Sequence, residues 1–168
     1  SGMAHISSHK TVEIIDLPGT YSLTPESMDE RIVAKQTLRW MGGEDKPQTI
    51  ISVVDAANLS RNLYLTSQIL DLDIPVIVAL NMMDRVRRRK QDIDPDALRK
   101  LLGVTAVIPM SAREKWGISE LQDAVADIQQ NTIMSSSLQL QIPDAINKEL
   151  QPIVDFFHNH CGYGKVMA

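Results

Sequence analysis

The apolar positions of this chain fall into two kinds of segment, short continuous runs and longer stretches with helical spacing. Four apolar runs have the length of buried strands, and they cover residues 11–16, 49–56, 74–80 and 105–110. Runs that are apolar throughout are typical of parallel strands covered on both faces. Because helical segments alternate with these strands, the pattern predicts an α/β fold with a mostly parallel sheet and flanking helices.

The same pattern divides the chain into four parts. Residues 1–10 resemble a cloning tag or an irregular leader and are set apart from the fold, whereas residues 11–130 form the α/β domain. Residues 131–141 are rich in serine and glutamine, which is typical of a linker. Residues 142–168 regain helical spacing and indicate the start of a helical domain.

Capping residues mark several of the expected boundaries. Thr24 and Asp94 each precede a proline, which is the sequence of an N-cap followed by proline in the first turn of a helix. Ser119 is expected to cap a third helix. Asp55 ends its strand, and we expect its carboxylate to cap the backbone that follows.

Composition and charge narrow the classes of function. The 168 residues are 43% hydrophobic and 23% charged, as in globular domains, and no apolar run is long enough to span a membrane. The net charge of −4 argues against nucleic acid as a partner. The basic residues at 85–90 are interpreted as a solvated loop, because acidic residues follow them directly. The single cysteine, Cys161, excludes an internal disulfide and fits a reducing compartment.

The first candidate site follows the strand at residues 11–16, where Asp16 and Gly19 have the spacing Asp-x-x-Gly. In nucleotide-binding α/β folds the ligand lies beyond the carboxyl ends of the strands, so Asp16 is expected at the rim of the sheet. There its carboxylate can hold Mg²⁺ through a water molecule, since magnesium keeps several waters. Gly19 lacks a Cβ, which allows its backbone N–H to approach a phosphate closely. Taken alone, the motif is also compatible with a plain turn.

The second and third candidate sites follow the next strands of the pattern. Asn81 and Asp84 form Asn-x-x-Asp after the run at 74–80, and Ser111 and Ala112 follow the run at 105–110. The carboxylate of Asp84 can accept hydrogen bonds from the N1–H and the exocyclic amine of guanine, an arrangement of donors that adenine lacks. The backbone N–H groups at 111–112 can reach the guanine O6. Together the three motifs indicate a guanine-nucleotide site.

These residues resemble the cytosolic GTPase domain of the bacterial ferrous iron transport protein B. The likeness covers roughly residues 11–130, and it is carried by the segments at 16–23, 54–66, 74–84 and 108–113. Its most specific parts are Asp-Leu-Pro-Gly-Thr-Tyr-Ser-Leu at 16–23 and Val-Asp-Ala-Ala-Asn-Leu-x-Arg-Asn-Leu-Tyr-Leu-Thr at 54–66.

The resemblance implies a P-loop GTPase-like fold, with GTP or GDP as ligand, Mg²⁺ as cofactor and K⁺ as a candidate second cation. It implies that Asp16 and Gly19 are the third GTPase motif, that Asn81 and Asp84 are the fourth, and that Ser111 with Ala112 is the fifth. A switch is expected at Thr20, Tyr21 and Ser22. The implied role is a cytoplasmic domain of a bacterial inner-membrane protein, whose nucleotide state regulates ferrous iron transport through the membrane permease region of the same protein.

One expected motif is absent from the sequence. No Gly-x-x-x-x-Gly-Lys-[Ser/Thr] segment occurs in the 168 residues, and this P-loop supplies the lysine and most backbone donors for the β-phosphate. The chain is therefore expected to be impaired in phosphate binding, and its hydrolysis of GTP is in doubt. In the family the P-loop strand lies between the strands at 11–16 and 49–55, so its loss leaves two interior edges open. Either a segment is omitted, or another copy supplies a strand by swapping in a homo-oligomer, or the packing is altered.

Two further alternatives stay open at this stage. The chain is a guanine-nucleotide-binding domain, or it is a non-catalytic α/β interaction or assembly module that no longer binds nucleotide. His158, His160 and Cys161 near the end of the chain invite a reading as iron ligands, but their spacing matches no known ligand pattern. The ordinary alternative is a helix end that carries histidine beside its dipole.

Hydrolysis is predicted to be slow even in an intact protein of this kind. Many GTPases orient the attacking water with a glutamine after the glycine of the third motif, whereas this chain has Thr20 and Tyr21. The threonine side chain is too short to replace a long amide, and we assign no catalytic residue. Single-turnover hydrolysis of GTP by an intact relative with this sequence checks the prediction. A rate like that of an efficient ATPase would contradict it.

Overall fold

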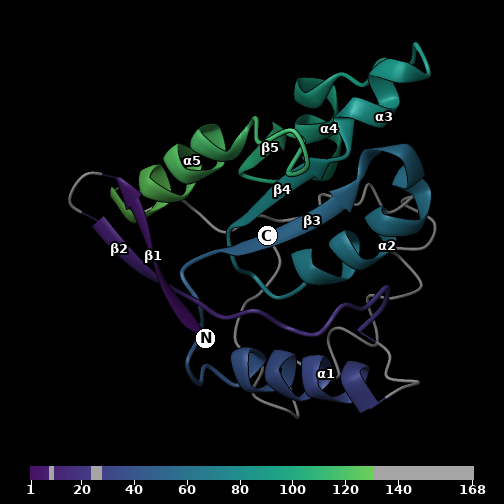
Figure 1. Ribbon diagram of the computed structural model, residues 1–168. Coiled ribbons are helices and arrows are strands. Elements are labelled where there is room, and N and C mark those ends of the chain that lie inside the picture. Colours follow the sequence, from purple (N-terminus) through teal and green to yellow (C-terminus); the bar gives the residue numbers. More distant parts are fainter. Residues whose placement is uncertain (8–9, 24–27, 131–168) are drawn as a thin grey trace. The chain divides into compact units, whose positions relative to one another are not determined.

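The computed structural model describes residues 1–7, 10–23 and 28–130. The elements in chain order (Figure 1) are β1 (Gly2–Ser7), β2 (Lys10–Ile14), α1 (Met28–Met41), β3 (Ile50–Asp55), the 3₁₀ helix η1 (Ala56–Asn58), α2 (Leu59–Leu70), β4 (Val76–Asn81), α3 (Met83–Arg88), α4 (Pro95–Leu102), β5 (Ala106–Pro109) and α5 (Ile118–Gln130).

The chain divides into two compact units, residues 1–138 and residues 139–168. The predicted linker at 131–141 and the predicted helical start at 142–168 lie outside the described residues, as do Thr24 and the three candidate iron ligands. Within the described ranges, no helix combines the length and the apolar character that a membrane crossing needs.

A three-stranded parallel sheet forms the centre of the fold, with the strand order β3-β4-β5. Its middle strand, β4, is buried on both faces. Val76, Val78 and Leu80 belong to one apolar cluster, which includes residues of α2, α3 and α4, while Ile77 packs with α5 residues in a second cluster. This explains why the run at 74–80 is apolar throughout, and it confirms the predicted α/β class.

Local capping explains where several helices begin. The carboxylate of Asp94 accepts hydrogen bonds from the backbone N–H groups of Asp96 and Ala97, and Asp55 accepts one from Ala57 at 2.8 Å. Both caps agree with the sequence predictions. The prediction for Ser119 is wrong, because α5 already begins at Ile118 and the Ser119 hydroxyl contacts Glu120 instead.

A second small sheet is formed by the first two strands, β1 and β2, which pair in antiparallel fashion. The expectation that residues 1–10 are an irregular leader is wrong for Gly2–Ser7, which form β1. Pairing with β2 orders this segment, and Ile6, at 7% exposed, packs with Val125 of α5 in the second apolar cluster. The side-chain amide of Gln122 on α5 also donates to the His5 carbonyl at 3.2 Å.

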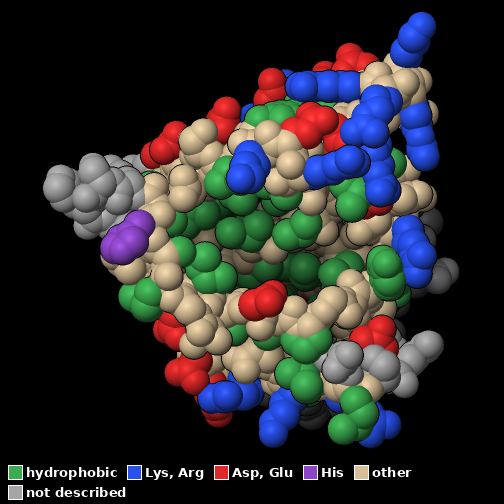
Figure 2. Space-filling model, viewed as in Figure 1, with side chains coloured by type: hydrophobic (Ala, Val, Ile, Leu, Met, Phe, Trp, Pro, Cys, Tyr) green, Lys and Arg blue, Asp and Glu red, His purple; other side chains and the backbone are tan. Residues whose placement is uncertain are grey.

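Each of the two sheets has two open edges among the described residues, and β2 and β3 are among the edge strands, because β2 pairs with β1 alone and β3 with β4 alone. The outer strand β3 exposes apolar side chains, with Ile51 at 37% and Val53 at 65% exposure. Figure 2 shows apolar side chains gathered in a hollow on the face turned to the viewer. An apolar edge strand that is unpaired on its outer side can pair with a further strand.

A buried hydrogen bond between Ser52 of β3 and Thr66 of α2 yields a stability prediction. The two hydroxyl oxygens lie 2.8 Å apart, and the Thr66 hydroxyl has a second acceptor in the Asn62 carbonyl at 3.4 Å. Thr66→Val should therefore lower the free energy of unfolding by about 1–3 kcal/mol, since it leaves the Ser52 hydroxyl buried without a partner. Ser52→Ala should have a smaller effect. Urea unfolding of both variants and of the double variant measures the coupling energy between the two hydroxyls. Strictly additive losses of stability would contradict an interaction between them.

Candidate functional site

The turn after β4 is built around the side chain of Asn81. Its Oδ1 accepts hydrogen bonds from the Met82 backbone N–H at 2.8 Å and from the Ala112 backbone N–H at 3.0 Å. Because β4 and β5 are parallel neighbours, their carboxyl ends meet at one edge of the sheet and bring residues 81 and 112 together. Met82 takes a left-handed backbone conformation with a φ of 63°, which strains a non-glycine residue and is typical of functional sites.

Asp84 lies in the first turn of α3 and is 5% exposed. Its Oδ1 accepts a hydrogen bond from the hydroxyl of Ser111 at 3.2 Å, and its Oδ2 lies 2.6 Å from Nη2 of Arg88. Ser111 is itself fully buried. A second tether between the two segments joins the backbone N–H of Met83 to the carbonyl of Met110 at 3.2 Å. The carboxylate is thus fixed from two sides.

The loop after β5 is closed upon itself. Ser111 and Trp116 exchange two backbone hydrogen bonds of 3.1 and 3.2 Å, and the Glu114 backbone N–H donates to the Ser111 hydroxyl at 3.3 Å. The guanidinium of Arg87 lies 4.3 Å from the centre of the Trp116 ring, a cation–π contact from α3. The turn ends at Gly117, whose φ is +80°.

The segment after β2 holds the other predicted residues, and local bonds shape it. Thr20 donates its hydroxyl to the Ser22 carbonyl at 2.6 Å and accepts from the Ser22 backbone N–H at 3.1 Å. Tyr21 lies under the guanidinium of Arg61, 3.8 Å from the ring centre. Because Arg61 is in the first turn of α2, which follows η1 and the carboxyl end of β3, this places Tyr21 near the edge of the sheet where β4 also ends.

Asp16 and Gly19 are exposed residues of this segment. A Cβ built on Gly19 would meet nothing within 4 Å, so close packing within the chain does not require a glycine there. Asp16 offers a hard oxygen donor, which fits Mg²⁺ held through water. Within the described ranges, no three His, Cys, Asp or Glu residues gather to form a metal site by themselves.

The structure therefore joins four of the six predicted nucleotide residues by direct hydrogen bonds: Asn81, Asp84, Ser111 and Ala112. The segment with Asp16 and Gly19 makes no hydrogen bond with them among the described residues. Arg88 was missed by the sequence analysis, although its spacing of four residues from Asp84 on a helix was a usable signal.

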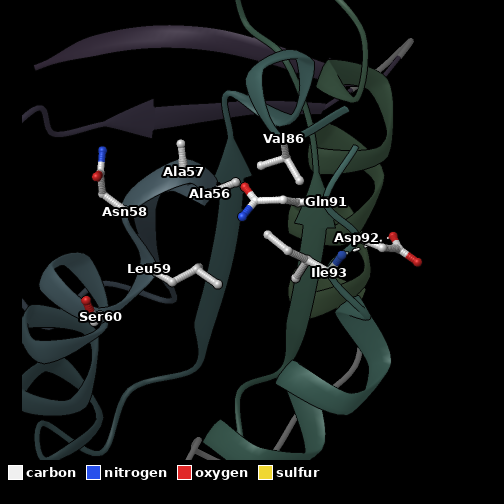
Figure 3. Close-up of a pocket in the computed structure, with 9 residues that line it drawn as sticks. All are labelled: Ala56, Ala57, Asn58, Leu59, Ser60, Val86, Gln91, Asp92 and Ile93. Atoms are coloured by element: carbon white, nitrogen blue, oxygen red, sulfur yellow. Dashed lines mark hydrogen bonds between the residues drawn. The ribbon is translucent and has the colours of Figure 1, made fainter. Parts of the chain in front are cut away.

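A pocket of about 370 Å³ lies beside this site and is shown in Figure 3. It is formed by η1 and the start of α2 on one side, and by Val86 and the loop at 91–93 on the other. None of the six predicted nucleotide residues lines it. No sequence motif indicates this pocket, because its lining residues are mostly small or apolar.

Comparison with known proteins gives consistent matches. The sequence model of the family described as ferrous iron transport protein B matches residues 1–125, which include the stretch that the sequence analysis set apart as a leader. The Fe(2+) transport protein A/Fe(2+) transporter FeoB fusion protein of Porphyromonas gingivalis is 40% identical over 117 residues, which are 70% of this chain and 13% of the relative.

Two solved structures show the same architecture. The cytosolic domain of Legionella pneumophila FeoB is 35% identical with a TM-score of 0.76, and the match covers 98% of this chain and 65% of that chain. The cytosolic domain of the Thermotoga maritima FeoB iron transporter in a GDP form is 30% identical with a TM-score of 0.79, covering 98% and 61%.

The fold is therefore that of a G domain of the GTPase class, with a parallel sheet and flanking helices. The chain belongs to the ferrous iron transport protein B family. It spans 13% of the length of the Porphyromonas gingivalis relative.

Gly117 yields a prediction about the loop that carries Ser111. A Cβ at this position would lie 2.5 Å from the Met110 Cβ and 2.6 Å from the Pro109 carbonyl oxygen. Gly117→Ala should lower the free energy of unfolding by about 2–4 kcal/mol, because it adds a backbone clash to the strain of a positive φ.

Gly43→Ala is the matched control, since Gly43 has a φ of +81° and open space around its Cβ position. This variant should lose only about 1 kcal/mol from conformational strain. Chemical denaturation of both variants measures the difference, and equal losses would refute the role of the clash.

Proposed function

We propose that this chain is the base-reading part of a guanine-nucleotide-binding domain, and the observation that carries the proposal is the buried carboxylate of Asp84. It lies at the carboxyl end of the central strand, in the position where α/β folds bind nucleotides. Its two oxygens match the N1–H and 2-amino donors of guanine. Adenine presents no such pair, and a buried carboxylate left without donors by the wrong base is penalised.

The neighbouring groups support the same assignment. The Ala112 backbone N–H donates to Asn81 Oδ1, and the Ser111 hydroxyl donates to Asp84, so the loop after β5 is tied both to the carboxylate and to the turn that precedes it. Asn81 fixes the turn between β4 and α3 and therefore the position of the carboxylate. These contacts exist before any ligand is bound, which reduces the ordering needed for recognition.

Fewer contacts support the phosphate side of the proposed site than its base side. Asp16 would hold Mg²⁺ through water, Gly19 would approach a phosphate, and Thr20, Tyr21 and Ser22 would form the switch. The P-loop sequence does not occur in the 168 residues, and β2 and β3 have open edges among the described residues. We therefore propose that phosphates add little to the affinity of this chain, and that it hydrolyses GTP poorly.

In the whole protein we propose that this domain lies on the cytoplasmic side of the bacterial inner membrane. Its nucleotide state would regulate the passage of ferrous iron through the membrane permease region of the same protein. The family membership supports this role, and the Thermotoga maritima relative was solved in a GDP form. Potassium is a candidate second cation at the phosphate side.

The second candidate function is an interaction or assembly module without nucleotide. The open edge of β3, with Ile51 and Val53 exposed, favours it, since such an edge pairs readily with a strand of another chain. A homo-oligomer formed by strand swapping is one form that this module could take.

Titration of the isotope-labelled chain separates the two functions. We expect GMP to shift the amide signals of Met82 and Ala112 at concentrations where AMP has no effect, because only guanine satisfies Asp84. We expect GDP to bind within about threefold of GMP, since phosphates contribute little without a P-loop. NMR spectroscopy detects such weak binding. Equal shifts with GMP and AMP, or none, would favour the interaction module.

A substitution at Asp84 tests the base contact itself. Asp84→Asn replaces one acceptor with a donor. The variant should therefore bind guanine more weakly and xanthine more tightly, because the O2 of xanthine accepts a hydrogen bond where the 2-amino group of guanine donates one. We expect the affinity ratio of GMP to XMP to fall at least about tenfold, which corresponds to about 1.4 kcal/mol. Asp96→Asn on α4 is the matched control and should leave the ratio unchanged. An unchanged ratio in Asp84→Asn would remove Asp84 from the base site.

A further inference from the structure

Arg88, one helical turn after Asp84, holds the carboxylate of the proposed base site. The side chain of Asp84 is 4% exposed, whereas that of Arg88 is 59% exposed. The arginine therefore reaches in from the surface to an anion that has lost most of its water. An exposed pair with this spacing contributes little, but a charge-assisted hydrogen bond of 2.6 Å to a buried carboxylate constrains it strongly.

The contact leaves acceptor positions for a base. An ionised carboxylate offers about four such positions, two on each oxygen. Arg88 contacts Oδ2 through a single nitrogen, and Ser111 donates to Oδ1. A bidentate arginine would instead have engaged both oxygens. One position on each oxygen therefore remains, which is the number that the N1–H and 2-amino groups of guanine require.

Arg88 also reaches the loop after β5. Its Nη2 lies 3.8 Å from Oε1 of Glu114, whose backbone N–H bonds to the Ser111 hydroxyl. The contacts thus form a ring through Arg88, Asp84, Ser111 and Glu114. Arg87 reinforces the connection through its contact with Trp116. Figure 2 shows Lys and Arg side chains gathered over the part of the view where Figure 1 places α3.

We propose that Arg88 is a positioning residue that sets the selectivity for guanine. It fixes the rotation of the Asp84 carboxylate, so that both free acceptor positions face the base together, and it ties α3 to the base-contacting loop. This inference rests on the proposed function, because it needs a guanine at Asp84. Its specific consequence concerns the 2-amino group, whose contact requires the second oxygen to be held in place.

The test compares GMP with IMP, which lacks the 2-amino group, by NMR titration of the 168-residue chain. Arg88→Ala should lower the affinity for GMP about tenfold and the affinity for IMP about threefold. The preference for GMP over IMP then falls about threefold, which corresponds to about 0.7 kcal/mol. Loss of folded protein alone would weaken both ligands equally and leave their ratio unchanged. Arg88→Lys should recover part of the preference, since an ammonium can make a single hydrogen bond to Oδ2.

Arg85→Ala is the matched control, because it removes the same charge from α3, and its exposed side chain has no hydrogen bond or ion pair among the described residues. It should leave the ratio of GMP to IMP unchanged. An unaltered ratio in Arg88→Ala, or tighter GMP binding, would overturn the inference while the proposed function stands. Failure of the unaltered chain to prefer GMP to AMP would overturn both.

Discussion

A charged group removed from water is the constraint on which the site depends. Asp84 is almost fully buried, and a buried carboxylate is tolerated only when its oxygens are hydrogen-bonded or paired with a cation. The hydroxyl of Ser111 and the guanidinium of Arg88 meet this requirement. The two contacts engage different oxygens of the carboxylate, so they satisfy the charge and fix its orientation.

This arrangement follows from the parallel sheet. β4 is the middle strand, apolar on both faces, and its register with β5 brings the two carboxyl ends to one edge. The turn at Met82 is strained. The Asn81 side chain holds it by accepting hydrogen bonds from the backbone N–H of Met82 and from that of Ala112 in the loop after β5. The strain is local, because the buried core beneath it fixes the ends of both strands.

The two ends of the proposed site differ in how firmly the chain holds them. At the base end, Asp84 and Ser111 are buried and joined to each other. At the phosphate end, Asp16 and Gly19 are exposed, and the bonds of Thr20 are mainly to its own turn. The described residues therefore fix the proposed base end through buried contacts between two loops, and they leave the proposed phosphate end exposed.

Local chemistry explains which expectations were confirmed. Three of the four apolar runs form the parallel strands, and the caps at Asp55 and Asp94 depend only on residues within the next turn. The prediction was wrong for the run at 11–16, because β2 pairs in antiparallel fashion with β1 and is mostly exposed. The first strand was missed because residues 2–7 carry no clear apolar period. Ile6 is buried there only because it packs with residues of α5, more than a hundred positions further along the chain. Sequence spacing does not record such a contact.

The sequence by itself determined the fold class, three strands of the parallel sheet and the identity of the polar residues that follow them. The tertiary structure decided which of those residues meet. It joined Asn81 to Ala112 and Asp84 to Ser111 through the pairing of β4 with β5, and it added Arg88 as a partner of a buried charge. The physical reason is that spacing along a chain encodes periodicity, whereas burial and hydrogen-bond partners depend on how distant segments pack.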